Sequence, residues 1–95
     1  MTAKPVVPRA SAIRDVDEAQ AALAFIDELE EAYRHIAQYP ASGSSRYASE
    51  LDVPGLRSWP LRRYPYVVFY RAQGGHIDVW RVLHGRRDIA AWLRE

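Results

Sequence analysis

The sequence predicts an α+β fold: a small antiparallel sheet, a meander of three or four strands, packed by one long helix, with a shortened first helix and a short C-terminal helix. Two observations carry this prediction. Residues Tyr66 to Tyr70 are an unbroken run of β-branched and aromatic side chains, which is typical of a strand covered on both faces. Residues Asp17 to Gln38 repeat apolar side chains at helical spacing. A chain of 95 residues, 48% of them hydrophobic, is expected to form a single domain over residues 1–95.

The first segment, Lys4 to Pro8, is a short apolar piece between prolines. It suits an edge strand, because a missing N–H does no harm there. Residues 9–16 are long enough only for a short helical turn, hence the shortened first helix. Asp17 is then expected to cap the long helix, where a carboxylate suits the positive N-terminal end.

The long helix is expected to end before Pro40, which cannot continue it. Its carboxylates are expected to face water and not to form an acid–base pair; they are Asp27, Glu28, Glu30 and Glu31. Its apolar positions recur at spacings of three and four, which places them on one stripe; they are Ala22, Ile26, Leu29, Tyr33 and Ile36.

Residues 41–55 are predicted to form a loop within the domain, which Tyr47 and Leu51 pin to the core. Strands are predicted at 56–59, 66–71 and 77–84, with a bend at 60–65 and a tight turn at Gly74-Gly75. At the end of the chain, Asp88 occupies a helix-cap position. The apolar set Ile89, Trp92 and Leu93 then indicates a short closing helix.

Alternation along the last strand predicts which side chains share a face. One face would hold Ile77, Val79, Arg81 and Leu83, and the other Asp78, Trp80, Val82 and His84. Arg81 is the exception on an apolar face, and a guanidinium is rarely buried without a partner.

Charge is divided unevenly along the chain. Residues 1–55 carry five basic and nine acidic side chains, whereas residues 56–95 carry eight arginines against three acids. Arginine without lysine favours planar, bidentate binding to phosphate or carboxylate. The alternative is that some arginines pair with the acidic helix of the same domain.

Several classes of chemistry are not expected. The chain has no cysteine, and His35, His76 and His84 lack metal-ligand spacing, so neither a disulfide nor a metal site is expected. Gly74-Gly75 precedes a strand and not a helix, so it is no phosphate loop. No serine lies in a nucleophile turn, and no cofactor is expected. The sequence shows no apolar run of about 18 residues and no signal peptide, so we expect a cytoplasmic protein without membrane contact.

Arginines interleaved with aromatic side chains remain as the candidate functional feature. Guanidinium groups suit the nucleic-acid backbone, and aromatic rings suit stacking on unstacked bases. For Tyr70 and Trp80, however, a place in the core is the preferred interpretation over base stacking. The full set is Arg57, Trp59, Arg62, Arg63, Tyr64, Tyr70, Arg71, Trp80, Arg81, His84, Arg86 and Arg87.

The run from Gly55 to Asp88 resembles the sheet of the RelE/ParE toxin superfamily. Its ending, Arg81-Val82-Leu83-His84-Gly85-Arg86-Arg87-Asp88, is similar to the ParE branch in particular. The ParE resemblance implies a toxin of a type II toxin–antitoxin system, acting in growth arrest and the bacterial stress response. Such a toxin inhibits DNA gyrase by binding it and trapping cleaved DNA, so no catalytic residue is expected.

The ParE resemblance also implies two partners besides gyrase. A cognate ParD-like antitoxin would form a hetero-oligomer with the chain, and that complex could bring indirect contact with DNA. The expected target contacts are Arg57, Arg62, Arg63, Arg81, His84, Arg86 and Arg87. The expected antitoxin contacts are Ile26, Leu29, Tyr33, Tyr70, Trp80 and Trp92.

Two alternatives stay open. A RelE-like, ribosome-dependent mRNA endoribonuclease would use Arg81 with Arg62 or Arg63 as cations and His84 as the acid. This chain lacks the RelE-type C-terminal tyrosine, and its only lysine is Lys4. The second alternative, motivated by the shortened first helix, is a non-toxic remnant that still binds an antitoxin.

Overall fold

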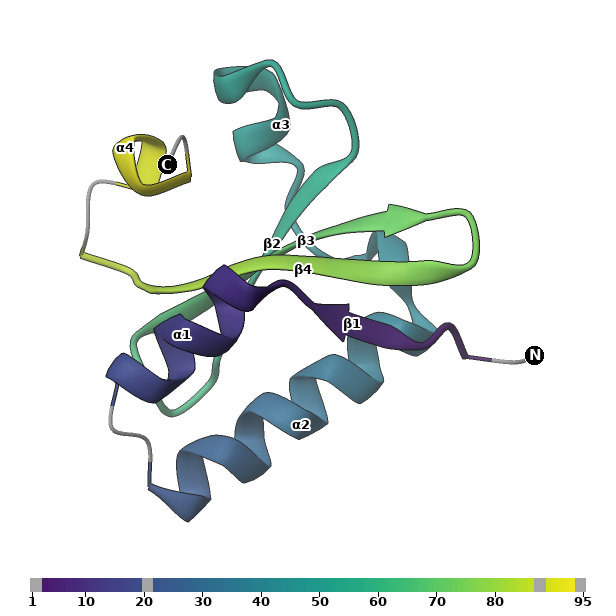
Figure 1. Cartoon of the computed structure of the whole chain (residues 1–95). Coiled ribbons are helices and arrows are strands. Elements are labelled where there is room, and N and C mark those ends of the chain that lie inside the picture. The colour runs from purple at the N-terminus through teal and green to yellow at the C-terminus, as the bar shows by residue number, and fades with distance from the viewer. Residues whose placement is uncertain (1–2, 20–21, 87–88, 94–95) are drawn as a thin grey trace.

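The computed structural model describes residues 3–19, 22–86 and 89–93. A four-stranded sheet of order β1-β4-β3-β2 forms its centre (Figure 1). The strands are β1 (Val6–Pro8), β2 (Leu56–Pro60), β3 (Tyr66–Gln73) and β4 (His76–His84). The helices are α1 (Ala10–Glu18), α2 (Leu23–Gln38), the 3-10 turn η1 (Pro40–Ser42), α3 (Arg46–Leu51) and α4 (Ile89–Leu93). The predicted α+β class is confirmed.

The meander β2-β3-β4 is antiparallel, as predicted, and Gln73 pairs with His76 across the tight turn. The predicted edge strand also forms, but β1 pairs with β4 in parallel, so the sheet is mixed. In this register Val6 lies opposite Ile77 and Pro8 opposite Val79. The parallel direction follows from the connection, because helices separate β1 from the meander and bring the chain back.

The first two helices depart from the prediction. Asp17 lies inside α1 and caps nothing, while α2 begins only at Leu23. α1 packs along β4, whereas α2 packs across one face of the sheet, so the two helices cannot be continuous. The chain therefore folds back, and α1 keeps nine residues against sixteen in α2.

One hydrophobic cluster lies between α2 and the sheet. It includes Phe25, Leu29 and Ile36 from the helix and Val68 and Tyr70 from β3. Leu29 and Ile36 confirm the predicted stripe, with Ile26 and Tyr33 partly buried at its margin. The prediction that Ala22 belongs to this stripe is wrong, because Ala22 is the exposed N-cap residue of α2. Phe25 faces the core instead.

A second cluster covers the opposite face of the sheet, where Figure 1 shows α3 and α4. It is built on Leu56, Phe69, Leu83 and Ile89. Residues 41–55 are not only a loop, since α3 forms within them, although Tyr47 and Leu51 do pack on this cluster as expected. The closing helix α4 also forms as predicted; Asp88, its expected cap, lies outside the described residues.

A β-bulge in β4 corrects the predicted alternation of faces. Phe69 pairs with Arg81 and Tyr70 with Val79, which leaves Trp80 without a partner on β3. An extra residue reverses the facing of all residues beyond it. Val79 and Val82 therefore share the α2 cluster, whereas Trp80 and Leu83 pack on the other side.

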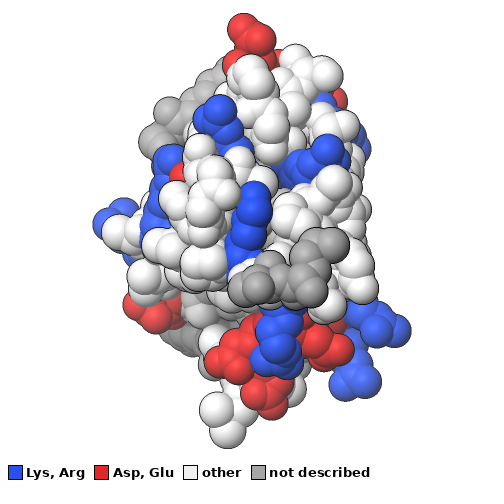
Figure 2. Space-filling model, turned by 90° about the vertical axis from the view of Figure 1, so that its right-hand side faces the viewer, with Lys and Arg blue, Asp and Glu red and all other residues white. Residues whose placement is uncertain are grey.

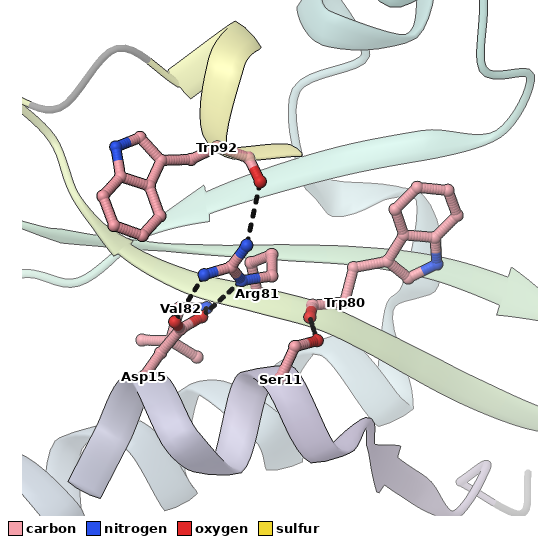
Figure 3. Close-up of polar contacts among 6 residues, drawn as sticks. All are labelled: Ser11, Asp15, Trp80, Arg81, Val82 and Trp92. Carbon is pink, nitrogen blue, oxygen red and sulfur yellow. Dashed lines mark hydrogen bonds and ion pairs between the residues drawn. The ribbon is translucent and has the colours of Figure 1, made fainter. Parts of the chain in front are cut away.

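The outer edge of β4 is covered along its length by one segment of chain. Ile77 N donates to Pro5 O at 2.8 Å, and Arg9 N donates to Val79 O at 2.9 Å. Past the end of β1, the side chains of α1 take over this role. Ser11 Oγ donates to Trp80 O at 2.9 Å, and Val82 N donates to Asp15 Oδ2 at 2.9 Å (Figure 3).

Candidate functional site

Four of the predicted contact residues come together at one end of the sheet. The β2–β3 connection and the end of β4 meet there, because Gly85 N donates to Pro65 O at 2.7 Å. We call this region the basic end and define it by Arg62, Arg63, His84 and Arg86. Its three arginines are exposed, and none forms an ion pair within the described part of the chain. They are therefore available to an anionic partner surface.

Glu28 of α2 fixes the backbone of the basic end. Its Oε1 accepts hydrogen bonds from Arg62 N and Arg63 N, both at 2.8 Å. Glu28 is half-buried, so the prediction that the acids of α2 face water holds for Asp27, Glu30 and Glu31 but not for this one. A carboxylate that accepts two backbone N–H groups orders the turn. The two arginine side chains themselves stay exposed.

Aromatic rings support the same end of the sheet. Phe25 makes edge-to-face contacts with Tyr64 and Tyr66, at ring-centroid distances of 5.2 and 5.1 Å. Tyr66 contacts the His84 ring at 5.2 Å across the β3–β4 pair. His84 Nδ1 accepts a hydrogen bond from Arg86 N at 3.1 Å. A neutral ring with Nδ1 as acceptor carries its proton on Nε2.

Arg81 lies elsewhere, buried between three elements (Figure 3). Its Nε donates to Asp15 Oδ2 at 2.8 Å and its Nη2 to Asp15 Oδ1 at 2.7 Å. Its Nη1 donates to the Trp92 carbonyl of α4 at 2.8 Å. The side chain is 11% exposed and that of Asp15 6%. The structure thus places Arg81 inside the fold, joining α1, β4 and α4, and not on the surface where a target contact would lie.

Tyr33 lies in the same electrostatic environment. Burial raises the pKa of its hydroxyl to about 12, and the nearby charge of Asp15 adds to the increase. Both effects disfavour the phenolate, since it loses hydration and faces another negative charge.

Arg57 is also apart from the basic end. It lies three residues before Pro60 on β2, about 10 Å along the strand, and its Nη1 donates to Gly43 O at 2.8 Å. Tyr70 belongs to the same buried network: its hydroxyl donates to Pro40 O at 2.9 Å and accepts from Gly43 N at 3.0 Å. Arg87 lies outside the described residues.

The six residues expected to contact an antitoxin do not share one surface. Ile26 and Tyr33 are partly buried against the α2 cluster, whereas Trp80 and Trp92 pack on the opposite face of the sheet. Leu29 and Tyr70 are buried, at 5% and 0% exposure. Arg9 lies over the Trp80 ring, 4.4 Å from its centroid, and chelates Asp78. A partner on either face would therefore meet only some of the predicted residues.

Two residues with clear roles were missed in the sequence. Asp15 binds Arg81, and Glu28 orders the basic end; the sequence pattern assigned no partner to Asp15 and predicted only a water-facing side chain for Glu28. The unusual arginine on an apolar strand face was a signal that a carboxylate must lie nearby, but it did not say which one. The described residues contain no group of three or more His, Cys, Asp or Glu able to hold a metal. Within the same residues no helix is long and apolar enough to span a bilayer.

Comparison with solved structures defines the class. The chain superposes on one chain of a structure titled "Chromosomal ParDE TA system from P. aeruginosa" with a TM-score of 0.67, covering 85% of this chain and 95% of that one. At 20% sequence identity this likeness shows the fold alone, a mixed sheet with helices on both faces.

Sequence comparison identifies the family within that class. The family described as "ParE toxin of type II toxin-antitoxin system, parDE" matches residues 6–89. Toxin ParE3 of Caulobacter vibrioides is 34% identical over 83 residues, which cover 84% of this chain and 78% of that protein. This chain belongs to the ParE toxin family.

Proposed function

We propose that this chain inhibits growth by binding DNA gyrase through the basic end, and that a cognate ParD-like antitoxin neutralises it by direct binding. The observation that carries the proposal is the exposure of Arg62, Arg63 and Arg86 at one end of the sheet without ion-pair partners among the described residues. Side chains held in this way suit contacts to DNA phosphates or to an acidic protein surface.

Binding without catalysis fits the chemistry of this end. Three guanidinium groups and one imidazole lie on or beside a turn that Glu28 and the Gly85–Pro65 hydrogen bond hold in place. A turn whose backbone is already held in place loses less freedom on binding than a loose loop would. No proton transfer is required to trap a complex of enzyme and cleaved DNA.

The test is a gyrase supercoiling and DNA-cleavage assay with the full chain, repeated with its antitoxin. We expect loss of supercoiling with trapped cleaved DNA, reversed by the antitoxin. The double variant Arg62→Ala/Arg63→Ala and the double variant Arg86→Ala/Arg87→Ala should both lose this inhibition while circular dichroism shows an intact fold. Arg46→Ala is the matched control, because Arg46 is an exposed arginine on α3 paired with Glu50. Full inhibition by the folded double variants would contradict the contact role.

The endoribonuclease alternative is disfavoured by the position of Arg81. Its guanidinium is bound to Asp15 and Trp92, so it would have to leave a buried ion pair to stabilise a reacting phosphate. Cleavage of ribosome-bound mRNA that depends on His84 would revive this alternative. A remnant without toxicity would instead bind antitoxin, cause no growth arrest and leave both gyrase and mRNA unaffected.

A further inference from the structure

Beside the basic end, a groove of about 620 Å³ runs between α2 and the β2–β3 connection. One wall is a stripe of α2 with residues four apart, Asp27, Glu31 and His35. Trp59 and Leu61 line the opposite side. The Trp59 indole stacks on His35, with ring centroids 4.5 Å apart and an interplanar angle of 29°. The groove thus combines a polar helical wall with apolar and aromatic surface.

The charged side chains around this groove form no ion pairs within the described part of the chain. Asp27, Glu28 and Glu31 lie on the helical side, and Arg62 and Arg63 lie across from them. None of the five forms an ion pair with another described residue. Figure 2 shows acidic side chains gathered at the bottom of the molecule, over α2, with basic groups beside them.

Two details show that the α2 side of the groove carries negative charge that its neighbours do not balance. Like charges four residues apart on a helix repel each other, so the Asp27 and Glu31 pair is unfavourable unless a cation lies between them. Glu28 Oε2 is inaccessible to solvent and has no hydrogen-bond donor among the described groups. A buried acceptor without a donor costs free energy.

We propose that this groove binds an extended segment of a partner protein that carries a basic residue and, two positions away, an acidic one. The basic side chain lies along Trp59 and Leu61 with its charged end between Asp27 and Glu31, and the acidic one meets Arg62 or Arg63. Side chains two apart on an extended segment point the same way and lie about 7 Å from each other. A single strand of RNA is a poorer occupant, because its phosphates would face the carboxylates of α2.

The test is an NMR titration of the ¹⁵N-labelled full chain with the peptide acetyl-Gly-Leu-Arg-Ala-Glu-Gly-amide. We expect shifts concentrated on the Trp59 indole N–H and on the amides of Arg62 and Arg63. Replacing the peptide arginine by glutamine should abolish them. The double variant Asp27→Asn/Glu31→Gln should weaken binding of the peptide by about tenfold. The double variant Asp17→Asn/Glu30→Gln makes the same change in net charge away from the groove and should bind like the parent.

Three results would overturn the proposal. Equal weakening by both double variants would show a general attraction between charges. Equal NMR shifts with the arginine peptide and the glutamine peptide would show that the basic side chain plays no part in binding. Stronger shifts at Trp59 with a single-stranded oligouridylate would assign the groove to nucleic acid. The groove shares Arg62 and Arg63 with the basic end, whereas Asp27 and Glu31 lie outside that end. Asp27→Asn/Glu31→Gln is therefore expected to leave inhibition of gyrase unchanged.

Discussion

Removal of the Asp15 carboxylate should destabilise the protein far more than removal of the Asp78 carboxylate, although both chelate an arginine. Asp15→Ala removes the carboxylate that binds two guanidinium nitrogens of the buried Arg81, and it deprives Val82 N of its acceptor. Breaking a buried pair on one side costs about 3–5 kcal/mol. A chain of 95 residues has a free energy of unfolding of about 5–14 kcal/mol. Asp15→Ala should therefore be marginally stable.

Asp78→Ala is the matched control. Arg9 chelates Asp78 just as closely, at 2.7 Å, but the Arg9 side chain is 49% exposed, so water can solvate it after the change. The expected cost is about 1 kcal/mol or less. Urea unfolding followed by circular dichroism measures both variants, and Asp15→Asn replaces Asp15→Ala if the latter does not fold. Equal midpoints for the Asp15 and Asp78 variants would refute the argument from burial.

Two further predictions concern other buried groups. Gly43→Ala should lower the free energy of unfolding by about 1–3 kcal/mol, because the new Cβ would lie 2.5 Å from the Tyr70 hydroxyl; Gly74→Ala, with no heavy atom within 4 Å, should change it little. Urea midpoints test this pair. Tyr33→Phe should become more stable than the parent above pH 10, by up to about 2 kcal/mol near pH 12. Because the folded-state pKa of Tyr33 is raised to about 12, the stability of the parent falls as pH rises from 10 to 12. Urea unfolding of both proteins at pH 8 and pH 11 tests this. Equal losses of stability between the two pH values in parent and variant would contradict it.

The parts of the fold that the sequence predicts are those with a strong local signal. The run at Tyr66–Tyr70, the two-glycine turn and the apolar stripe through Leu29 and Ile36 each correspond to an observed element. The break between α1 and α2 has no such signal, since residues 17–22 contain neither glycine nor proline. Packing α1 against β4 and α2 against the sheet requires that break. This is a tertiary effect that helix propensity does not contain.

The bulge at Trp80 explains why the site was only partly predicted. A bulge needs no glycine, and one extra residue changes the facing of every later side chain in β4. Alternation alone therefore misassigned the neighbours of Arg81. The clustering of Arg62, Arg63, His84 and Arg86 depends on a contact between Pro65 and Gly85, twenty positions apart, which no local pattern specifies.

α1 can cover the outer edge of β4 because the rise of an α-helix over four residues nearly equals the length of two strand residues. Four residues of α-helix rise about 6 Å, and two residues of strand span about 6.6 Å. The spacing of Ser11 and Asp15 therefore matches that of Trp80 O and Val82 N, and the two side chains form the hydrogen bonds that a neighbouring strand would otherwise form. The difference of about 0.6 Å accumulates with each repeat, so a helix can imitate a strand for one turn only. A serine and an acid four apart, just after a proline that ends a short edge strand, is thus a compact way to close a sheet against unwanted pairing with other chains.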